Sequence, residues 1–274
     1  MRLLKVMVIA SVLGALTTQV SAAGKSLKLS SSTSIEDTGL LDHLIPAFEE
    51  RTGIEVQLVA VGAAQAMKLA EDGAVDVTVL HAPTAEKAFL DAGHGVNRRT
   101  FMVNYYVVIG PPDDPAGVLA VQSSQDAFKA IAASSYPFVS RGDGSGTHER
   151  EQEIWKAATG AAPRTKPWYM ETEKGMLQTL DIADRKGAYT LSDSATFQMA
   201  EGRLQAKILF RKRSQALYNP YSVIAVNPAT HADVHYMEAM QFIAFVTSPE
   251  GQRMIGDFRD GSGNRLFVPL TRVD

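Results

Sequence analysis

The chain of 274 residues is long enough for one large domain or for two lobes that each bury a core. It contains no cysteine, which excludes disulfide bonds, a lipid-anchored cysteine and any metal site made of thiolates. Its formal charge of −3 at pH 7 lacks the basic surplus that is typical of a nucleic-acid-binding protein.

The first 22 residues have the pattern of a secretory signal peptide. Arg2 and Lys5 precede an apolar run over 6–20, and the small residues Ser21 and Ala22 follow. This segment is too short and wrongly flanked for a membrane anchor. Its removal takes away two basic and no acidic residues, which moves the formal charge from −3 to −5. We therefore expect an exported, periplasmic protein.

Strands and helices alternate in the first part of the mature chain. The spacing of apolar residues predicts strands over 27–29, 54–61 and 75–80 and helices over 40–52, 64–71 and 84–92. This βαβ rhythm is typical of a parallel sheet. A polar loop, Ser30–Ser34, separates the first strand from the first helix, and Pro46 should kink that helix or mark its first turn.

A second α/β series follows a long apolar strand at 101–109 and a cluster of breakers at 110–115. Helices are predicted over 124–134, 147–158, 173–186 and 194–201, and strands over 137–140, 188–191 and 206–210. A turn at Asn219–Tyr221, an apolar strand at 222–226 and two amphipathic helices over 236–247 and 249–258 complete the chain.

The two long apolar strands, at 101–109 and 222–226, bracket the second series. We therefore predict an α/β protein of two lobes, with residues 23–106 and 219–274 in lobe 1 and residues 107–218 in lobe 2. A ligand would bind in the cleft between the lobes, where strand ends and helix N-termini converge.

The stretch from Pro137 to His148 predicts a short buried strand, a glycine-rich turn and the start of a helix. Ser145 and Thr147 are natural N-cap residues. The first amides of a helix have no intrahelical partner and carry the positive end of its dipole, and Arg141 adds a fixed charge. The stretch therefore predicts a cradle for an anion. The alternative is an ordinary capped helix whose arginine forms a surface ion pair.

Ser31–Ser34 is a second candidate for anion contact. Its four hydroxyl groups and the neighbouring backbone amides could surround an oxyanion, since a hydroxyl can turn its hydrogen toward an acceptor. The alternative is simple N-capping of the following helix, for which one hydroxyl suffices.

A hydrolase triad of Asp143, Ser145 and His148 is a further hypothesis. Triads are made by neighbours in space rather than in sequence, and the chain has no nucleophile-elbow motif. We therefore expect a protein that is not an enzyme. Asp143 and Asp193 are better explained as groups that orient Arg141 or cap a turn.

Histidines and carboxylates elsewhere do not have the spacing of a metal site. His81, Glu86 and His94 lie in one region without the spacing of metal ligands, so structural or solvated roles are expected. We expect neither a bound metal nor a cofactor.

Motifs spread over nearly the whole mature chain form a specific set. They include SSTS at 31–34, EDTGLL at 36–41, VAVG at 59–62, GPPDDPA at 110–116, FVSRGDGSGTH at 138–148 and NPY at 219–221. This set resembles the periplasmic tungstate-binding proteins of ABC uptake systems, the TupA family. The resemblance implies a type II periplasmic binding protein, in which two α/β lobes close over a dehydrated tetrahedral oxyanion.

The resemblance also implies a site and a partner. The anion contacts would be Ser32, Thr33 and Ser34 from the first loop and Arg141, Ser145, Gly146 and Thr147 from the second. The ligand would be tungstate or the related oxyanion molybdate, and the partner would be the membrane permease of an ABC transporter. The protein itself would be a monomer.

Several positions depart from the family pattern. They are Ala63, Ala64, Tyr105, Leu177 and Ser194, where the family usually has Thr, Gly, Asp, Gly and Arg. We expect these positions to face the cleft. The departures leave open a different oxyanion or a small organic anion as the ligand, and a role in sensing rather than transport.

Overall fold

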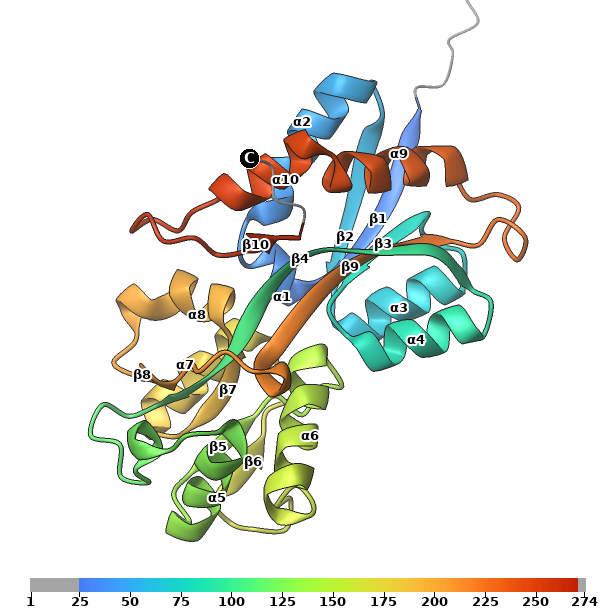
Figure 1. Cartoon of the computed structure of the whole chain (residues 1–274). Helices are drawn as coiled ribbons and strands as arrows, with labels where there is room; N and C mark the ends of the chain where they lie inside the picture. The colour runs from blue at the N-terminus through green and yellow to red at the C-terminus, as the bar shows by residue number, and fades with distance from the viewer. Residues whose placement is uncertain (1–24, 271–274) are drawn as a thin grey trace, which may run out of the picture.

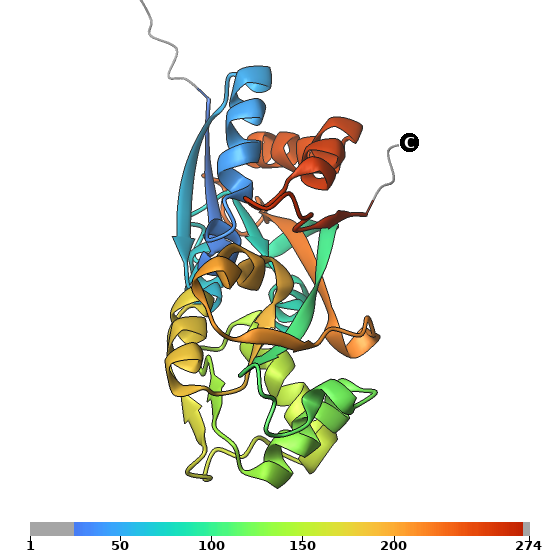
Figure 2. The same cartoon turned by 90° about the vertical axis from the view of Figure 1, so that its left-hand side faces the viewer.

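The structure, a computed structural model, describes residues 25–270. Figures 1 and 2 show two groups of helices and strands connected by two long strands, β4 (Gly95–Gly110) and β9 (Tyr218–Val226). We call the group that contains the first strands lobe 1 and the other lobe 2. The predicted signal peptide lies outside the described residues. Within residues 25–270, no helix is long and apolar enough to cross a membrane.

Lobe 1 is a mixed sheet with helices on both faces. Besides β4 and β9 it contains β1 (Ser26–Ser32), α1 (Thr33–Glu36), α2 (Leu40–Thr52), β2 (Glu55–Val61), α3 (Ala63–Glu71), β3 (Val77–Leu80), α4 (Pro83–Asp91), α9 (Tyr236–Thr247), α10 (Pro249–Asp257) and β10 (Val268–Pro269). β1 lies between β2 and β3 and runs parallel to both, as the βαβ rhythm predicts. β9 is antiparallel to β3 and to β4, so the sheet is not purely parallel.

The side chains of β9 show how lobe 1 is filled. Val223 and Ala225 pack with α2, α9 and α10, whereas Ile224 and Val226 pack with α3 and α4. Successive side chains of a strand point to opposite faces of the sheet, so an uninterrupted apolar strand is expected where both faces are covered. The helices seen on either side of the sheet in Figure 1 provide that cover.

Lobe 2 is built around the second half of β4. It contains η1 (Val118–Ala120), α5 (Ser124–Ser134), β5 (Phe138–Ser140), α6 (Gly146–Thr159), β6 (Tyr169–Glu171), α7 (Met176–Lys186), β7 (Thr190–Asp193), α8 (Ser194–Ala200), η2 (Glu201–Arg203), β8 (Lys207–Phe210) and η3 (Gln215–Leu217). β7 and β8 pair antiparallel with the end of β4, and β5 pairs parallel with β6. Phe128, Phe138 and Trp155 form an aromatic core, with ring centroids 4.5–5.5 Å apart.

Each lobe therefore has its own apolar core, with Ala195 of α8 packed against that of lobe 1, and within residues 25–270 only β4 and β9 run continuously between the lobes. The chain crosses from lobe 1 to lobe 2 along β4 and returns along β9. The proposed boundaries, after residues 106 and 218, fall within or next to these strands and stay a prediction. Movement of one lobe relative to the other would bend these two strands, because the other elements belong to one lobe each.

The first serine-rich segment is not the loop that its composition predicts. β1 continues through Ser32, because Ser30, Ser31 and Ser32 pair with the parallel strand β2. The buried Ser30 hydroxyl contacts the carbonyl oxygen of Ala66 at 3.1 Å and the hydroxyl of Thr78 at 2.9 Å. A hydroxyl can be buried in a strand when such partners are present. Only Thr33 and Ser34 leave the strand, and they begin α1.

The turn predicted at Asn219–Tyr221 is also wrong, because β9 starts at Tyr218 and includes these residues. Pro220 pairs with β4, while β3 pairs with β9 only from Ser222 onward. One side of the strand therefore has no neighbour at Pro220, which is where a residue without an N–H group is tolerated. The structure also starts α7 at Met176 rather than at Glu173, which has a positive φ of 54°.

Glu151 is an unusual carboxyl group inside the core of lobe 2. It accepts hydrogen bonds from the Trp155 indole at 3.2 Å and the Tyr169 hydroxyl at 2.7 Å. Burial raises its pKa from 4.5 to about 7. Between these two values the folded protein keeps a proton that the unfolded chain releases, so stability falls as the pH rises through this window.

We expect Glu151→Gln to be more stable than the wild type at pH 8 by about 2–3 kcal/mol, because the variant has no carboxyl to ionise. Denaturant unfolding at pH 5 and pH 8 measures the difference. At pH 5 the two proteins should be close in stability, and Glu153→Gln on the exposed side of α6 is the matched control. Equal stability of wild type and Glu151→Gln at pH 8 would contradict the assignment.

Candidate functional site

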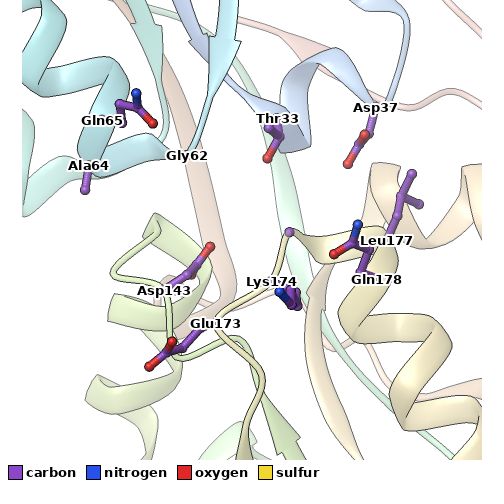
Figure 3. Close-up of a pocket in the computed structure, with 11 residues that line it drawn as sticks. Thr33, Asp37, Gly62, Ala64, Gln65, Asp143, Glu173, Lys174, Leu177 and Gln178 are labelled. Carbon is purple, nitrogen blue, oxygen red and sulfur yellow. The ribbon is translucent and has the colours of Figure 1, made fainter.

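A cavity of about 560 Å³ lies between the two lobes. Lobe 1 contributes Thr33, Asp37, Gly62, Ala64 and Gln65, and lobe 2 contributes Asp143, Glu173, Lys174, Gly175, Leu177 and Gln178. Figure 3 shows the lobe 1 group on one side of the opening and the lobe 2 group on the other. The cavity therefore occupies the cleft that the two-lobed fold predicts.

The start of α6 has the geometry predicted for an anion cradle. Gly142 and Gly144 both adopt a φ of 68°, a backbone conformation that residues other than glycine rarely adopt. Ser145 is the N-cap residue, and its hydroxyl accepts the N–H of His148 at 3.4 Å. The helix then runs for 14 residues, so its first amides face the turn with the positive end of the dipole behind them. Gly146 and Thr147 are buried within this first turn.

Arg141 is the central charged group beneath the cleft. Its side chain is only 2% exposed. Nε donates to Asp143 Oδ2 at 3.1 Å and Nη2 donates to the same oxygen, so the ion pair uses one edge of the guanidinium group. Nη1 is buried and has no hydrogen-bond partner among residues 25–270. A buried donor without a partner is costly, and an anion in the cleft would satisfy it.

The loop at the end of β1 presents one hydroxyl to the cleft and buries two. Thr33 lines the cavity, and Figure 3 shows its side chain at the opening. Ser32 and Ser34 are at most 2% exposed, and their hydroxyl oxygens lie 3.4 Å apart. Ser34 Oγ also lies 3.1 Å from Nε2 of the buried His81. The predicted contacts from this loop are therefore close together but not equally accessible.

The two predicted loops both lie next to His81 of lobe 1, since Ser34 contacts its ring and Gly146 lies against its backbone. Gly146 of lobe 2 lies so close to lobe 1 that a Cβ at this position would be 2.0 Å from the carbonyl oxygen of His81. Thr196 Oγ1 of α8 lies 3.5 Å from the carbonyl oxygen of Ser34. The structure thus brings both predicted segments to one place, with the lobes in contact at the back of the cleft.

Carboxyl groups surround the mouth of the cavity. Asp37, Asp143 and Glu173 line it with one cationic side chain, Lys174. Burial raises the pKa of Asp37 to about 6, and the negative charges of Glu36 and Asp193 add to the effect. The fixed positive charge for an anion therefore lies deeper, at Arg141, and not at the rim.

The departures from the family pattern do not all face this cleft. Ala64 and Leu177 line the cavity, as expected. Ala63, the first residue of α3, is buried in the apolar core between α3 and the sheet. Tyr105 and Ser194 line a separate cavity of about 220 Å³ that also contacts Arg213, whose guanidinium carbon lies 5.0 Å from the centre of the Tyr105 ring. The expectation that all five face the cleft is wrong for these three, because β4 and α8 direct the last two away from it.

Ser145 and His148 do not have the geometry of a nucleophile and its base. The Nδ1 atom of His148 accepts the backbone N–H of Gly144 at 2.9 Å, and Ser145 Oγ contacts the His148 amide instead of its ring. Within residues 25–270, no three His, Asp or Glu side chains gather in a way that could hold a metal ion.

Four side chains next to the site form a group that the sequence analysis did not connect. His81 is buried at the end of β3 and contacts Asn219 of β9, while Asn104 of β4 contacts Asp193. Asp193 also caps α8 by accepting the N–H of Thr196 at 3.0 Å, one of the two roles expected for it. These four side chains are far apart in the sequence and form no local motif, so only the fold brings them together.

The fold and the cleft define a binding protein of two α/β lobes, the type II periplasmic binding protein. The model of the PBP superfamily domain matches residues 17–250. A crystal structure of the tungstate ABC transporter from Geobacter sulfurreducens is 41% identical, covers 85% of this chain and 98% of its own, and has a TM-score of 0.79. The tungstate-binding protein TupA from Desulfovibrio alaskensis is 42% identical over 90% of this chain and 100% of its own, with a TM-score of 0.78.

A further relative is also similar in sequence over most of the chain. The tungstate-binding protein TupA of Peptoclostridium acidaminophilum is 36% identical over 248 residues, which are 89% of this chain and 85% of the relative. The chain belongs to the TupA family within the PBP superfamily.

Proposed function

We propose that this protein captures tungstate, or the related oxyanion molybdate, between its lobes and delivers it to the permease of an ABC transporter. The observation that carries the proposal is the buried Arg141, whose Nη1 has no hydrogen-bond partner among residues 25–270 and which lies four residues before the N-cap Ser145 of α6. Tungstate and molybdate are acceptors only, so a site made of a guanidinium group, helix amides and hydroxyls suits them. The names of the relatives support this choice of ligand.

The same proposal includes the location and the way the protein acts. We propose export through the N-terminal segment to the periplasm, action as a monomer, and binding without chemical conversion of the ligand. The site residues proposed for the anion are Ser32, Thr33, Ser34, Arg141, Ser145, Gly146 and Thr147. No resident cofactor is needed for this role.

A small organic anion is the second candidate ligand. The cavity of about 560 Å³ lies within the range of roughly 300–1,000 Å³ typical of small-molecule sites. Leu177 adds an apolar contact at its wall. An anion with a short carbon skeleton could therefore fill the opening while its charged group reaches Arg141.

Thermal unfolding of the mature chain in the presence of different anions tests the proposal. The series contains tungstate, molybdate, sulfate, phosphate and several carboxylates. A ligand that binds only the folded protein raises the midpoint temperature of unfolding. At a ligand concentration of a hundred times Kd, the added free energy of unfolding is about 2.7 kcal/mol. A rise with tungstate, alone or with molybdate, is the expected result. A rise with a carboxylate alone would favour the second candidate and overturn the first.

Asp37 should make anion binding pH-dependent. Its pKa is already raised to about 6, and a dianion bound nearby would raise it further, so binding is coupled to proton uptake. We therefore expect tungstate affinity to increase as the pH falls from 7.5 toward 6. Asp37→Asn should bind more tightly than wild type at pH 7.5, by a few-fold to about tenfold, and should lose this dependence. Calorimetric titration with tungstate at pH 7.5 and pH 6 measures the affinity of both proteins. An unchanged pH dependence in Asp37→Asn would contradict the assignment of the pH dependence to Asp37.

A further inference from the structure

A row of buried side chains connects the serine loop of lobe 1 to Asp193 of lobe 2. Ser34 lies 3.1 Å from His81 Nε2, and His81 Nδ1 lies 3.1 Å from Asn219 Oδ1. Asn219 Nδ2 donates to Asn104 Oδ1 at 2.7 Å, and Asn104 Nδ2 donates to Asp193 Oδ1 at 3.1 Å. All five residues are at most 3% exposed. Asn104 and Asn219 face each other on β4 and β9, the two strands that join the lobes.

The direction of every hydrogen bond in this row follows from its Asp193 end. Asp193 Oδ1 accepts the backbone N–H of Thr196, so the same oxygen must accept from Asn104 as well. Turning the Asn104 amide over would place two oxygens face to face. Asn104 therefore presents Oδ1 to Asn219, and Asn219 must donate to it from Nδ2. Asn219 is left with Oδ1 toward His81.

His81 must then carry its hydrogen on Nδ1, because Asn219 Oδ1 can only accept. Burial lowers the pKa of His81, so the ring is neutral and Nε2 is an acceptor. Its stacking on Tyr221, with ring centroids 4.7 Å apart, holds the ring plane in place. Tyr106, 3.5 Å from Nδ1, lies on the same side as Asn219. The hydroxyl hydrogen of Ser34 therefore points at His81 Nε2.

We infer that Asp193, Asn104, Asn219 and His81 are positioning residues that turn the Ser34 hydroxyl hydrogen away from the anion. The Ser34 oxygen can then accept a hydrogen bond from Ser32, whose hydroxyl oxygen lies 3.4 Å away. Among the three hydroxyls of this loop, that of Thr33 lines the cavity and is placed to donate into the cleft. The inference rests on the proposed function for the ligand, but the orientation of the row does not depend on it.

Nitrogen-15 NMR of the ligand-free, histidine-labelled mature chain tests the orientation directly. His81 is identified among the six histidines by the signals that disappear in His81→Gln. The expected result at pH 7.5 is a neutral ring with its hydrogen on Nδ1. A hydrogen on Nε2, or a charged ring, overturns the inference. Asn219→Ala removes the oxygen that accepts from His81 Nδ1, so the tautomer with its hydrogen on Nε2 should become populated. If Asn219 only filled space, its replacement would not change the tautomer of His81.

Titration with tungstate tests the consequence for binding. Thr33→Val, which replaces the hydroxyl by a methyl group of similar size, should weaken binding about tenfold or more, whereas Ser34→Ala should weaken it by less than about fivefold. A larger loss in Ser34→Ala than in Thr33→Val overturns the inference. If the wild type does not bind tungstate, the proposed function fails. The tautomer of His81 still tests the hydrogen-bond directions in the row, because that measurement needs no ligand.

Discussion

Replacement of Arg141 by alanine should remove most of the affinity for the anion. The side chain is 2% exposed, and its Nη1 is buried without a hydrogen-bond partner among residues 25–270. A charge-assisted hydrogen bond contributes about 1.5–3 kcal/mol, and the lost positive charge adds to this inside a buried site. We expect binding to weaken at least about 100-fold, which corresponds to about 3 kcal/mol, in a calorimetric titration with tungstate.

Asp143 complicates that measurement, because it pairs with Arg141 and lines the cavity. In Arg141→Ala its carboxylate would face the anion without compensation. The double variant Arg141→Ala/Asp143→Asn removes this repulsion, so the affinity that it recovers separates the repulsion from the lost donor. Arg253→Ala on the exposed face of α10 is the control for a lost surface arginine. Wild-type affinity in Arg141→Ala would overturn the assignment of the site.

The cradle could be predicted from the sequence because its parts are close together in the chain. Arg141, the positive-φ glycines and the N-cap Ser145 lie within a few residues, so local backbone preferences determine their arrangement. The same holds for most helices, whose apolar periodicity is a local signal. The placement of Ser30–Ser32 in a strand depends instead on pairing with β2, which the polar side chains conceal.

The row from Ser34 to Asp193 could not be predicted, since its contacts join residues up to 138 positions apart. Asn104 and Asn219 resemble ordinary polar residues until β4 and β9 are paired in register. Tyr105, the neighbour of Asn104 on β4, lines the cavity of about 220 Å³ and not the cleft, which its position in the sequence does not reveal. Which residues face a cleft is therefore set by strand register, and one sequence does not determine it.

Gly146→Ala should impair binding by keeping the lobes apart. The added Cβ would be 2.0 Å from the carbonyl oxygen of His81 and 2.9 Å from its carbonyl carbon, which are backbone atoms of the opposite lobe. Alanine suits the first turn of a helix, so α6 itself should form normally. Relief of the clash then requires the lobes to separate. Overpacking costs about 1–3 kcal/mol, so we expect tungstate affinity to fall about 10- to 100-fold.

Two measurements distinguish this explanation from general damage to the fold. Small-angle X-ray scattering should give a larger radius of gyration for Gly146→Ala than for the wild type in the presence of ligand, because β4 and β9 permit the lobes to separate without unfolding either core. Gly202→Ala is the matched control, since nothing lies within 4 Å of a Cβ at that position and its φ is not in the left-handed region. If Gly146→Ala binds tungstate and compacts as the wild type does, contact between Gly146 and His81 is not part of the ligand-bound state.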